Sequence, residues 1–339
     1  MKAAVLREFH RPLSLEEREI PSPGDGEVLV KVRASGLCVS DLHIQDGMIA
    51  STPLPHVPGH ETAGEVAALG ENVRNFSVGD HVIVGIDVTC GECRFCRTGR
   101  GNLCKNLKRT GFELDGGHAE YVTARREQLF KIDHAVPFAE ACIIPDAVAC
   151  MYHAIKAQAG VRAGDRALIL GAGGLGMQGI RILKYFGAET WCTSRQKAKL
   201  DLARSLGADH ALDSTAATLV AEIERMTDGE MCDVVFDNIG IASSVQTSLG
   251  LIRPGGKVVV VGYNDPAFTV GYQDLVIREK EVIGIRGSTR QEIAEVVRLA
   301  ERGKIKPFVW RTIPFEEINE GLNALRKGES MGRTVVMFD

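Results

Sequence analysis

Six residues, Gly171-Ala172-Gly173-Gly174-Leu175-Gly176, constrain the fold of this chain more than any other short stretch. They follow an apolar run at 166–170 that we expect to form a strand, and a helical pattern continues from Met177 to Phe186. The G-x-G-x-x-G pattern is weak evidence alone, because glycine-rich tight turns are common. Between a strand and a helix it favours a dinucleotide site, where glycines let the pyrophosphate approach the backbone and the helix N-terminus.

The alternation of strands and helices continues after this loop. Strand patterns recur at 189–193, 234–237 and 257–261, and a helix is expected at 197–206. Strands that alternate with helices predict an α/β fold with a parallel, doubly wound sheet. We therefore expect a Rossmann dinucleotide-binding domain over residues 148–287.

The first part of the chain has a different pattern. Short apolar strands are expected at 28–34, 64–69 and 81–84, with turn-forming segments rich in Pro, Gly, Ser and Asp between them. This pattern predicts a β-rich, partly closed barrel over residues 1–147.

The end of the chain, residues 288–339, is expected to complete that β-rich domain. It contains two amphipathic helices, at 291–302 and 315–327, and then a strand at 333–338. A strand needs a sheet partner, and the β-rich domain is the better host. The doubly wound domain is then an insertion, with both ends of the chain in the other domain.

Composition narrows the possible functions. The chain has 339 residues, with 40 Lys and Arg against 44 Asp and Glu, so its net charge of −4 gives no basic footprint for nucleic acid. We find no run of about 18 apolar residues and expect no membrane-spanning helix. Charges in Met1–Arg7 interrupt any signal-peptide core, and the nine cysteines, an odd number, indicate a reducing cytoplasm.

Four of the cysteines follow one another with the spacing Cys-x2-Cys-x2-Cys-x7-Cys. Four thiolates from one loop match the closed tetrahedral shell of a structural Zn²⁺. An iron–sulfur cluster and a pair of disulfides are the alternatives, but bacterial cluster motifs usually end in a short Cys-x3-Cys-Pro step. We therefore expect a structural zinc bound by Cys90, Cys93, Cys96 and Cys104.

The segment after the second strand bears on the type of dinucleotide. An NAD site places Asp or Glu about 20 residues after the glycine motif, where it binds the ribose 2′-hydroxyl. This chain has Ser194 and Arg195 there, with Lys199 close by, and hydroxyl and cationic groups suit a 2′-phosphate. We expect NADP(H) to be preferred. The alternative is an exposed basic turn that does not discriminate between the cofactors.

Three further segments hold side chains suited to metal binding or proton transfer. One combines a thiol, a hydroxyl, a carboxylate and an imidazole, the next pairs a His with a Glu, and the third supplies an acid and a cysteine. Taken singly, a Cys or a His is most often a packing residue, and we interpret the other histidines, including His56 and His118, in that way. The candidates are Cys38, Ser40, Asp41, His43, His60, Glu61, Asp146 and Cys150.

With these motifs, the whole chain resembles the zinc-containing medium-chain dehydrogenase/reductase family of alcohol and polyol dehydrogenases. The resemblance rests on Gly-His-Glu-x-x-Gly at 59–64, the four-cysteine loop, the glycine motif, and the segments 251–258 and 332–336. It implies a GroES-like catalytic domain beside the Rossmann domain and two Zn²⁺ per subunit, one catalytic and one structural. It also implies a nicotinamide cofactor at Gly171, Gly173, Gly174, Leu175 and Gly176.

The resemblance further implies roles at the catalytic zinc. Cys38 and His60 would be its first two ligands, and Asp146 stands at the position of the third. Glu61 would be an exchangeable fourth ligand, and Asp41 would orient His60. The chemistry agrees, because Cys, His and Asp are all accepted zinc donors and three protein ligands leave one position open.

Some of these assignments have rivals. Cys150 lies one helical turn from Asp146 and is the rival third ligand. By resemblance, the alcohol proton would pass to solvent through Ser40, the nicotinamide ribose and His43, and an imidazole is suited to that exit near neutral pH. Ser40 could instead cap a short helix. Val39 stands where some relatives have a basic residue for the pyrophosphate, so we assign Arg333 to cofactor binding.

The sequence therefore predicts a zinc-dependent enzyme that interconverts an alcohol and its ketone or aldehyde with NADP(H). An NAD(H)-dependent polyol or sugar dehydrogenase is the alternative among enzymes, and a dinucleotide-binding protein without turnover is the alternative outside them. We expect a homo-oligomer, a tetramer or dimer, joined through strands near 257–261 and 281–287, although a buried central strand has the same pattern. The substrate is expected to be a hydrophobic or aromatic alcohol rather than a polyol, because apolar residues occur at Met48, Ile49, Leu54 and Phe112.

Overall fold

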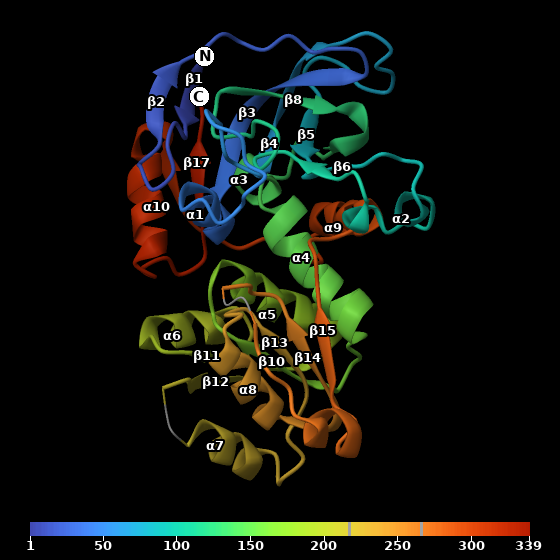
Figure 1. Ribbon diagram of the computed structural model, residues 1–339, viewed down its shortest axis with the longest axis vertical. Coiled ribbons are helices and arrows are strands. Elements are labelled where there is room, and N and C mark those ends of the chain that lie inside the picture. The colour runs from blue at the N-terminus through green and yellow to red at the C-terminus, as the bar shows by residue number, and fades with distance from the viewer. Residues whose placement is uncertain (216–217, 265–266) are drawn as a thin grey trace. The chain divides into compact units, whose positions relative to one another are not determined.

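The computed structural model describes residues 1–215, 218–264 and 267–339, and it divides into two units. Unit 1 comprises Met1–Ala149 and Ser288–Asp339, and unit 2 comprises Cys150–Gly287. Both ends of the chain therefore belong to unit 1 (Figure 1). For comparison, the boundaries expected from the sequence fall after residues 147 and 287.

Unit 1 is built on a seven-stranded sheet in which the long strand β3 (Glu27–Leu37) is central. Valines at 28, 30 and 32 are buried on β3, whereas Lys31 and Arg33, which alternate with them, are partly exposed, as expected for a strand with one face on the core. Antiparallel pairing joins β3 to β4, β8 and β17. The other strands are β4 (Glu61–Leu69), β5 (His81–Val84), β8 (Tyr121–Arg125), β9 (Leu129–Lys131), β16 (Val309–Pro314) and β17 (Arg333–Met337).

Shorter elements surround this sheet. Two further antiparallel pairs join β1 (Lys2–Val5) to β2 (Ser14–Glu17), and β6 (Asp87–Val88) to β7 (Lys108–Arg109). The last helix packs against β3 and β16, where Ile318 and Leu322 enter the same core as Leu37. The helices of unit 1 include α1 (Val39–Gln45), α2 (Arg94–Arg97), α3 (Phe138–Ala141), α9 (Arg290–Glu301) and α10 (Ile318–Arg326).

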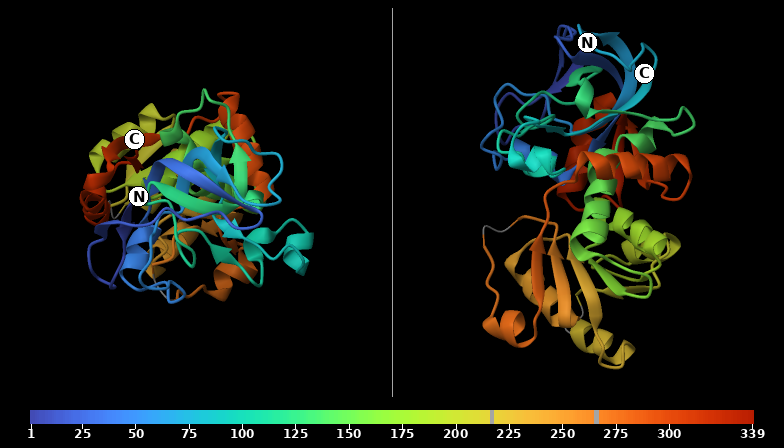
Figure 2. Two further views of the ribbon diagram at one scale, coloured as in Figure 1. Left: turned by 90° about the horizontal axis from the view of Figure 1, so that it is seen from above. Right: turned by 90° about the vertical axis from the view of Figure 1, so that its right-hand side faces the viewer.

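Unit 2 is a six-stranded parallel sheet in the order β12-β11-β10-β13-β14-β15, with helices packed along it (Figure 2). This is the strand order of a doubly wound dinucleotide-binding fold. Residues 167–170 and 190–194 are buried without interruption, as expected for parallel strands covered on both faces. The strands are β10 (Arg166–Leu170), β11 (Glu189–Ser194), β12 (His210–Asp213), β13 (Cys232–Asp237), β14 (Ile252–Val260) and β15 (Glu281–Gly284), and the helices include α5 (Gly174–Phe186), α6 (Lys197–Ser205), α7 (Leu219–Met226) and α8 (Ala242–Leu251).

The structure confirms the predicted α/β fold class. It also confirms that the last strand joins the sheet of the β-rich domain. β17 pairs with β3 and β16, so the C-terminal strand belongs to the β-rich unit. One expectation about assembly is wrong. The strand near 257–261 lies in β14, which pairs with β13 on one side and β15 on the other, so it cannot continue a sheet into a second subunit. In the described part of the chain, β15 is the edge strand on that side.

A long helical segment, Phe138–Ala159, connects the units along the chain. It includes α4 (Ala149–Tyr152) and two π-helical turns, Ile144–Val148 and His153–Ala159. By length and apolar content alone it could cross a membrane, but most of its apolar window is buried inside the protein, as in a core helix. The first π-helical turn carries Asp146, and such turns occur frequently at functional sites.

Candidate metal centres and dinucleotide site

Three residues far apart in the sequence converge in unit 1. β3 pairs with β4 so that Gly36 lies opposite Glu61, which brings Cys38, after the end of β3, close to His60, before the start of β4. The π-helical turn supplies Asp146, whose Oδ2 lies 3.6 Å from the Cys38 sulfur and 3.6 Å from Nε2 of His60. All three donor atoms lie within 4.8 Å of one another.

The spacing of these donors fits a tetrahedral Zn²⁺. Bonds of about 2.3 Å to sulfur and about 2.0–2.2 Å to nitrogen or oxygen place neighbouring donors about 3.4–3.6 Å apart. Nε2 of His60 is buried and makes no hydrogen bond in the described part of the chain, so its lone pair is available to a metal. Burial alone would lower the pKa of His60, but the Asp41 and Asp146 carboxylates outweigh it and raise that pKa. A cation at this position would replace the proton that the two carboxylates attract.

Asp41 supports the same imidazole from the opposite side. It is the third residue of α1, and its Oδ2 accepts the backbone N–H of Cys38 at 2.8 Å, a capping contact that fixes the start of the helix. Its Oδ1 lies 3.5 Å from Nδ1 of His60. Burial would raise the pKa of Asp41, but the rings of His60 and His118 lower it well below the usual range. The carboxylate is therefore ionised and keeps the His60 proton on Nδ1.

Arg333, expected at the cofactor, lies beneath the metal ligands. Its guanidinium is 2% exposed and donates to Glu61 Oε1 at 3.0 Å and to Asp146 Oδ2 at 2.9 Å. Burial would raise the pKa of Asp146, but His60 and Arg333 outweigh it and hold that pKa at about 2. Burial raises the pKa of Glu61 to about 8, although Arg333 opposes the shift. Glu61 lies outside the three-donor group and accepts the backbone N–H of Ala147.

The remaining candidates of this site are placed as follows. Ser40 is half-buried on α1, with its Oγ 3.7 Å from the Cys38 sulfur. His43 is buried one helical turn further along α1. Among the described residues, the candidate ligand group contains Asp146 and not Cys150.

The four expected cysteines form a second cluster, in a lobe that we define as residues 90–109. Four Sγ–Sγ distances are 3.9 Å for Cys90–Cys96, 3.5 Å for Cys93–Cys96, 4.0 Å for Cys93–Cys104 and 3.5 Å for Cys104–Cys90. A tetrahedral zinc with four sulfur ligands has edges of about 3.8 Å. The four residues therefore fit a closed four-thiolate site.

Charge within this cluster also favours a cation. The backbone N–H groups of Cys96 and Lys105 lower the pKa of Cys93 to about 6, which favours a thiolate there. Burial, followed by the neighbouring sulfurs, raises the pKa of Cys96 to about 11. The thiols cannot all ionise side by side without a cation to compensate them.

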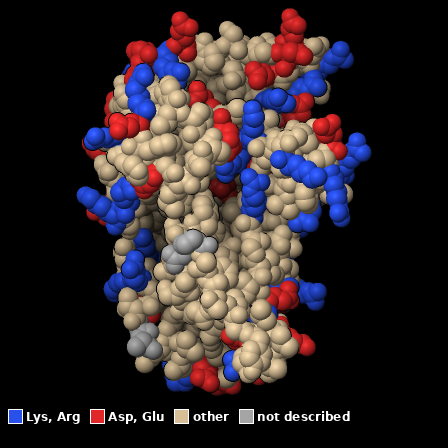
Figure 3. Space-filling view, in the orientation of Figure 1, with Lys and Arg blue, Asp and Glu red and all other residues tan. Residues whose placement is uncertain are grey.

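The surface of this lobe is basic. Figure 3 shows Lys and Arg side chains gathered over it, whereas the charges elsewhere on unit 1 in this view are more evenly mixed. Glu92 is the acidic residue of the segment. Its exposed cations are Arg94, Arg97, Arg100, Lys105 and Lys108.

The glycine motif of unit 2 has the conformation that a dinucleotide site requires. β10 ends at Leu170, Gly171 adopts φ +101°, and α5 begins at Gly174. A Cβ on Gly176 would collide with the carbonyl oxygen of Gly171, so only glycine allows this close approach. Among the described residues no side chain caps the start of α5, which leaves its first N–H groups for a phosphate.

The residues expected to select the cofactor lie at the end of β11. Ser194 is buried and its Oγ accepts the backbone N–H of Gln196 at 3.2 Å, while Arg195 is exposed. Burial, and then the charge of Arg195, lowers the pKa of the half-buried Lys199. Asp213 pairs with Ser194 across the sheet, but its carboxylate accepts from the backbone and hydroxyl of Thr215.

Sequence analysis missed two features of these sites. Asn238 follows β13 beside Gly171, and both polar atoms of its buried amide lack a hydrogen-bond partner in the described part of the chain. His118, interpreted as a packing residue, faces Asp41 with its Nε2 3.6 Å from Oδ1. Neither residue belongs to a sequence motif, so only the fold brings them to the sites.

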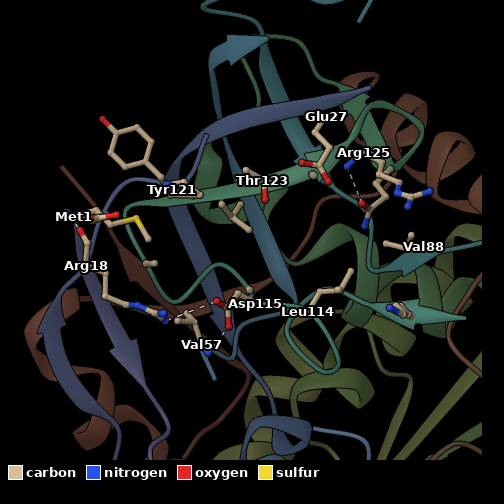
Figure 4. Close-up of a pocket in the computed structure, with 18 residues that line it drawn as sticks. Met1, Arg18, Glu27, Val57, Val88, Leu114, Asp115, Tyr121, Thr123 and Arg125 are labelled. Carbon is tan, nitrogen blue, oxygen red and sulfur yellow. Dashed lines mark hydrogen bonds and ion pairs between the residues drawn. The ribbon is translucent and has the colours of Figure 1, made fainter. Parts of the chain in front are cut away.

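Unit 1 also has a cavity of about 350 Å³ that none of the candidate metal ligands lines (Figure 4). It is lined by strand β8 and by the N-terminal segment around Arg18, and Asp115 pairs with Arg18 across it at 3.7 Å. Three basic and three acidic side chains are among the residues that line it. The charged lining is Arg18, Lys108, Arg125, Glu19, Glu27 and Asp115.

Comparison with known proteins agrees with this arrangement. Residues 24–134 match the alcohol dehydrogenase GroES-like domain, and residues 174–302 match the zinc-binding dehydrogenase domain. An alcohol dehydrogenase of Geobacillus stearothermophilus is 35% identical over 99% of this chain and 98% of its own length. The crystal structure of an NAD-dependent alcohol dehydrogenase superposes with a TM-score of 0.95 at 30% identity, covering 100% of both chains. An acetophenone reductase of Geotrichum candidum in complex with NAD has a TM-score of 0.89 at 34% identity, covering 99% of this chain and 97% of its own. The chain therefore belongs to the zinc-containing medium-chain dehydrogenase/reductase family of alcohol dehydrogenases.

Proposed function

We propose that this alcohol dehydrogenase binds two Zn²⁺ per subunit, a catalytic ion at Cys38, His60 and Asp146 and a structural ion at the four cysteines of the lobe. The observation that carries the proposal is the convergence of three different donors, from three distant segments, at distances suited to one tetrahedral ion. Three protein donors leave a fourth position for a substrate oxygen, whereas the four-thiolate cluster leaves none.

A bound Zn²⁺ would polarise the substrate oxygen and stabilise the alkoxide, and a bound nicotinamide would accept or return the hydride. The protein's own residues hold the donors and move the proton. Asp41 retains the His60 proton on Nδ1, which leaves Nε2 for the metal. Ser40 Oγ, next to the Cys38 sulfur, takes the alcohol proton, and His43 on the same helix passes it toward solvent.

Glu61 and Arg333 complete the proposed site. Oε2 of Glu61 is buried and has no hydrogen-bond partner in the described part of the chain, so it can serve as an exchangeable fourth ligand. A Cβ on Gly36 would collide with this oxygen, which explains the glycine opposite Glu61 in the β3–β4 register. Arg333 donates to both Glu61 and Asp146 and so holds these two side chains beside the proposed metal, and we include it in cofactor binding as predicted.

The preferred cofactor is proposed to be NADP(H). Support comes from Ser194, Arg195 and Lys199, which place a hydroxyl and two cations where an NAD site has a carboxylate. Asp213, which could repel a 2′-phosphate, is engaged by Thr215. The compared structures include an NAD-dependent enzyme and an NAD complex, so the prediction depends on these side chains alone.

The substrate is proposed to be a hydrophobic or aromatic secondary alcohol or its ketone. Phe112 is buried, and its ring centroid lies 4.9 Å from that of His60, so an aromatic surface adjoins the metal ligands. Met48 and Leu54, in the segment before His60 that is expected to form a substrate loop, have exposed apolar side chains. One relative of similar structure is an acetophenone reductase, an enzyme named for an aryl ketone.

We propose a cytoplasmic homo-oligomer. None of the nine cysteines forms a disulfide in the described part of the chain, and a reducing compartment would keep them as thiols or metal ligands. β15 presents the sheet edge, and exposed apolar side chains precede it in the chain. A second copy of that edge would cover them; they are Tyr272, Leu275, Val276 and Ile277.

The test is a substrate panel of primary, secondary, aromatic and polyol alcohols, each assayed with NADP⁺ and NAD⁺. We expect the highest kcat/KM with an aromatic or other apolar secondary alcohol and NADP⁺. A clear preference for polyols with NAD⁺ would instead identify a polyol or sugar dehydrogenase. Absence of turnover with every alcohol and carbonyl would contradict the proposal.

A further inference from the structure

His118 is a fully buried histidine that no sequence motif marks. It precedes β8, is 0% exposed, and has one ring nitrogen against a hydroxyl and the other against a carboxylate. Its Nδ1 lies 2.9 Å from Ser35 Oγ, and its Nε2 lies 3.6 Å from Asp41 Oδ1. The ring therefore sits at the end of a chain of polar groups that leads to His60.

Asp41 is the residue that contacts both histidines in this series of polar groups. Its Oδ2 accepts the backbone N–H of Cys38, and its Oδ1 faces two imidazole nitrogens, Nδ1 of His60 at 3.5 Å and Nε2 of His118 at 3.6 Å. A carboxylate can accept from several donors at once. Both distances are longer than an ordinary hydrogen bond, so the two rings act on this oxygen as ion-pair partners, and two such partners restrict its rotation more than one would.

The proton positions follow from the partners. An ionised carboxylate only accepts, so Nε2 of His118 must carry a proton to make a favourable contact. The neutral ring then has a lone pair on Nδ1, and the Ser35 hydroxyl donates to it. Ser35, His118, Asp41 and His60 thus form one directed series of donors and acceptors that ends at the proposed metal ligand.

Packing holds the His118 ring in this orientation. Gly59, at φ +100°, adjoins it so closely that a Cβ there would lie 2.6 Å from both the backbone nitrogen and Nδ1 of His118. A Cβ on Gly117 would collide with Thr62 on β4. The backbone N–H of His118 donates to the Pro58 carbonyl oxygen at 3.0 Å, which fixes the loop beside His60.

We propose that His118 is a positioning residue of the catalytic metal site, which acts by sharing the Asp41 carboxylate with His60. The inference rests on the proposed zinc at Cys38, His60 and Asp146. Asp41 held by two imidazoles keeps His60 in one tautomer and one ring orientation. It also gives less electron density to His60 than it would if His60 were its only ring partner, which leaves a bound metal a stronger Lewis acid. Residues of this kind typically change metal affinity or activity by about 10- to 100-fold when replaced.

The experiment compares zinc retention in His118→Leu and His118→Gln with the wild-type holoenzyme. Leucine is close to histidine in size and removes the donor, whereas glutamine keeps an N–H group near the position of Nε2. Each protein, loaded with Zn²⁺, is titrated with dipicolinate while released zinc is measured, and the four-cysteine zinc serves as an internal standard. His56→Leu is the matched control, because His56 is equally buried in unit 1 but faces Asp115.

We expect His118→Leu to release one zinc per chain at about 10- to 100-fold lower chelator concentration, with His118→Gln close to wild type. Cobalt substitution should show the same pattern, with a shifted visible spectrum in the leucine variant alone. Ser35→Ala removes the hydroxyl that fixes the His118 tautomer. It should release the zinc at a chelator concentration between those for His118→Leu and the wild type, and it replaces His118→Leu if that variant does not fold.

Two results would overturn the inference. In one, His118→Leu retains zinc like the wild type; in the other, both His118 variants lose it equally, which would indicate packing rather than hydrogen bonding. Failure of the proposed function gives a different result, because wild type and Cys38→Ala would then contain the same amount of zinc.

Discussion

The four-cysteine lobe and the Cys38–His60–Asp146 site gather metal donors in opposite ways. The lobe takes all four sulfurs from one short stretch, residues 90–104, which the ion itself can hold together. The other site takes its donors from just after one strand, just before another, and a π-helical turn whose Asp146 lies 108 residues after Cys38. It is held by the folded β3–β4 pair and by surrounding polar groups.

This difference suits the lobe to a structural ion and the Cys38–His60–Asp146 site to an ion that binds substrate. Four like donors satisfy a zinc ion and leave no position for substrate. Three unlike donors leave one position, and Asp41, His118, Glu61 and Arg333 surround them with hydrogen bonds and charge. In the lobe, backbone N–H groups donate to the sulfurs instead, as those of Cys90 and Asn106 do to the Cys104 sulfur, and the cations lie on the surface.

The largest expected effect on turnover comes from Asp146→Ala. Loss of a ligand removes polarisation of the substrate oxygen, worth several kcal/mol, so kcat/KM should fall by about 10³-fold or more. Steady-state kinetics with the best alcohol measures it. Cys150→Ala is the control and should keep wild-type activity; the reverse pattern would make Cys150 the third ligand.

A smaller effect on kcat/KM is expected from replacing a residue of unit 2 that is proposed to bind the 2′-phosphate of NADP⁺. Arg195→Ala should lower kcat/KM with NADP⁺ by about 10- to 100-fold, because it removes a charge-assisted contact, and should leave NAD⁺ kinetics nearly unchanged. Lys197→Ala is the matched control, since Lys197 pairs with Asp201 on the exposed face of α6. Equal losses with both cofactors would argue against a phosphate contact.

His43→Ala tests proton exit at the catalytic site. We expect turnover to fall by about 10-fold at neutral pH, less than the 10²–10⁴-fold typical of groups that transfer the proton directly. Raising the pH should restore part of the rate, because hydroxide can then accept the proton. The pH profile of kcat measures this, with His134→Ala as control, and a profile identical to wild type would remove His43 from the relay.

The smallest effect on chemistry is expected in the lobe. Cys93→Ala should leave kcat of the folded enzyme within about twofold of wild type, while the melting temperature falls by about 5–10 °C because one sulfur ligand is lost. Thermal unfolding and kinetics on the same sample measure both. A loss of kcat without a change in melting temperature would contradict the claim that the zinc of the lobe is structural and not catalytic.

Sequence reasoning was most successful where information is local. The strand–glycine–helix unit at 166–186 and the strand at 81–84 lie where periodicity placed them, because both signals depend on neighbouring residues. The spacing of the four cysteines likewise predicted their cluster.

Other features depend on contacts between distant segments. The sequence could not show that β14 is internal and β15 is at the edge, because both strands have similar apolar patterns. It also gave no reason to place Arg333 beneath Asp146 or His118 beside Asp41. Such contacts arise only when β3, β4 and β17 pair, so a single sequence without that register cannot show them.

The central claim, that the chain holds one open and one closed zinc site, is tested most directly by metal content per chain. Inductively coupled plasma mass spectrometry should find two zinc ions in the wild-type protein and one in each of Asp146→Ala and Cys93→Ala. The zinc left in Asp146→Ala should accompany normal thermal stability, and the zinc left in Cys93→Ala should accompany turnover. Two zinc ions in Asp146→Ala, or only one in the wild type, would contradict the account.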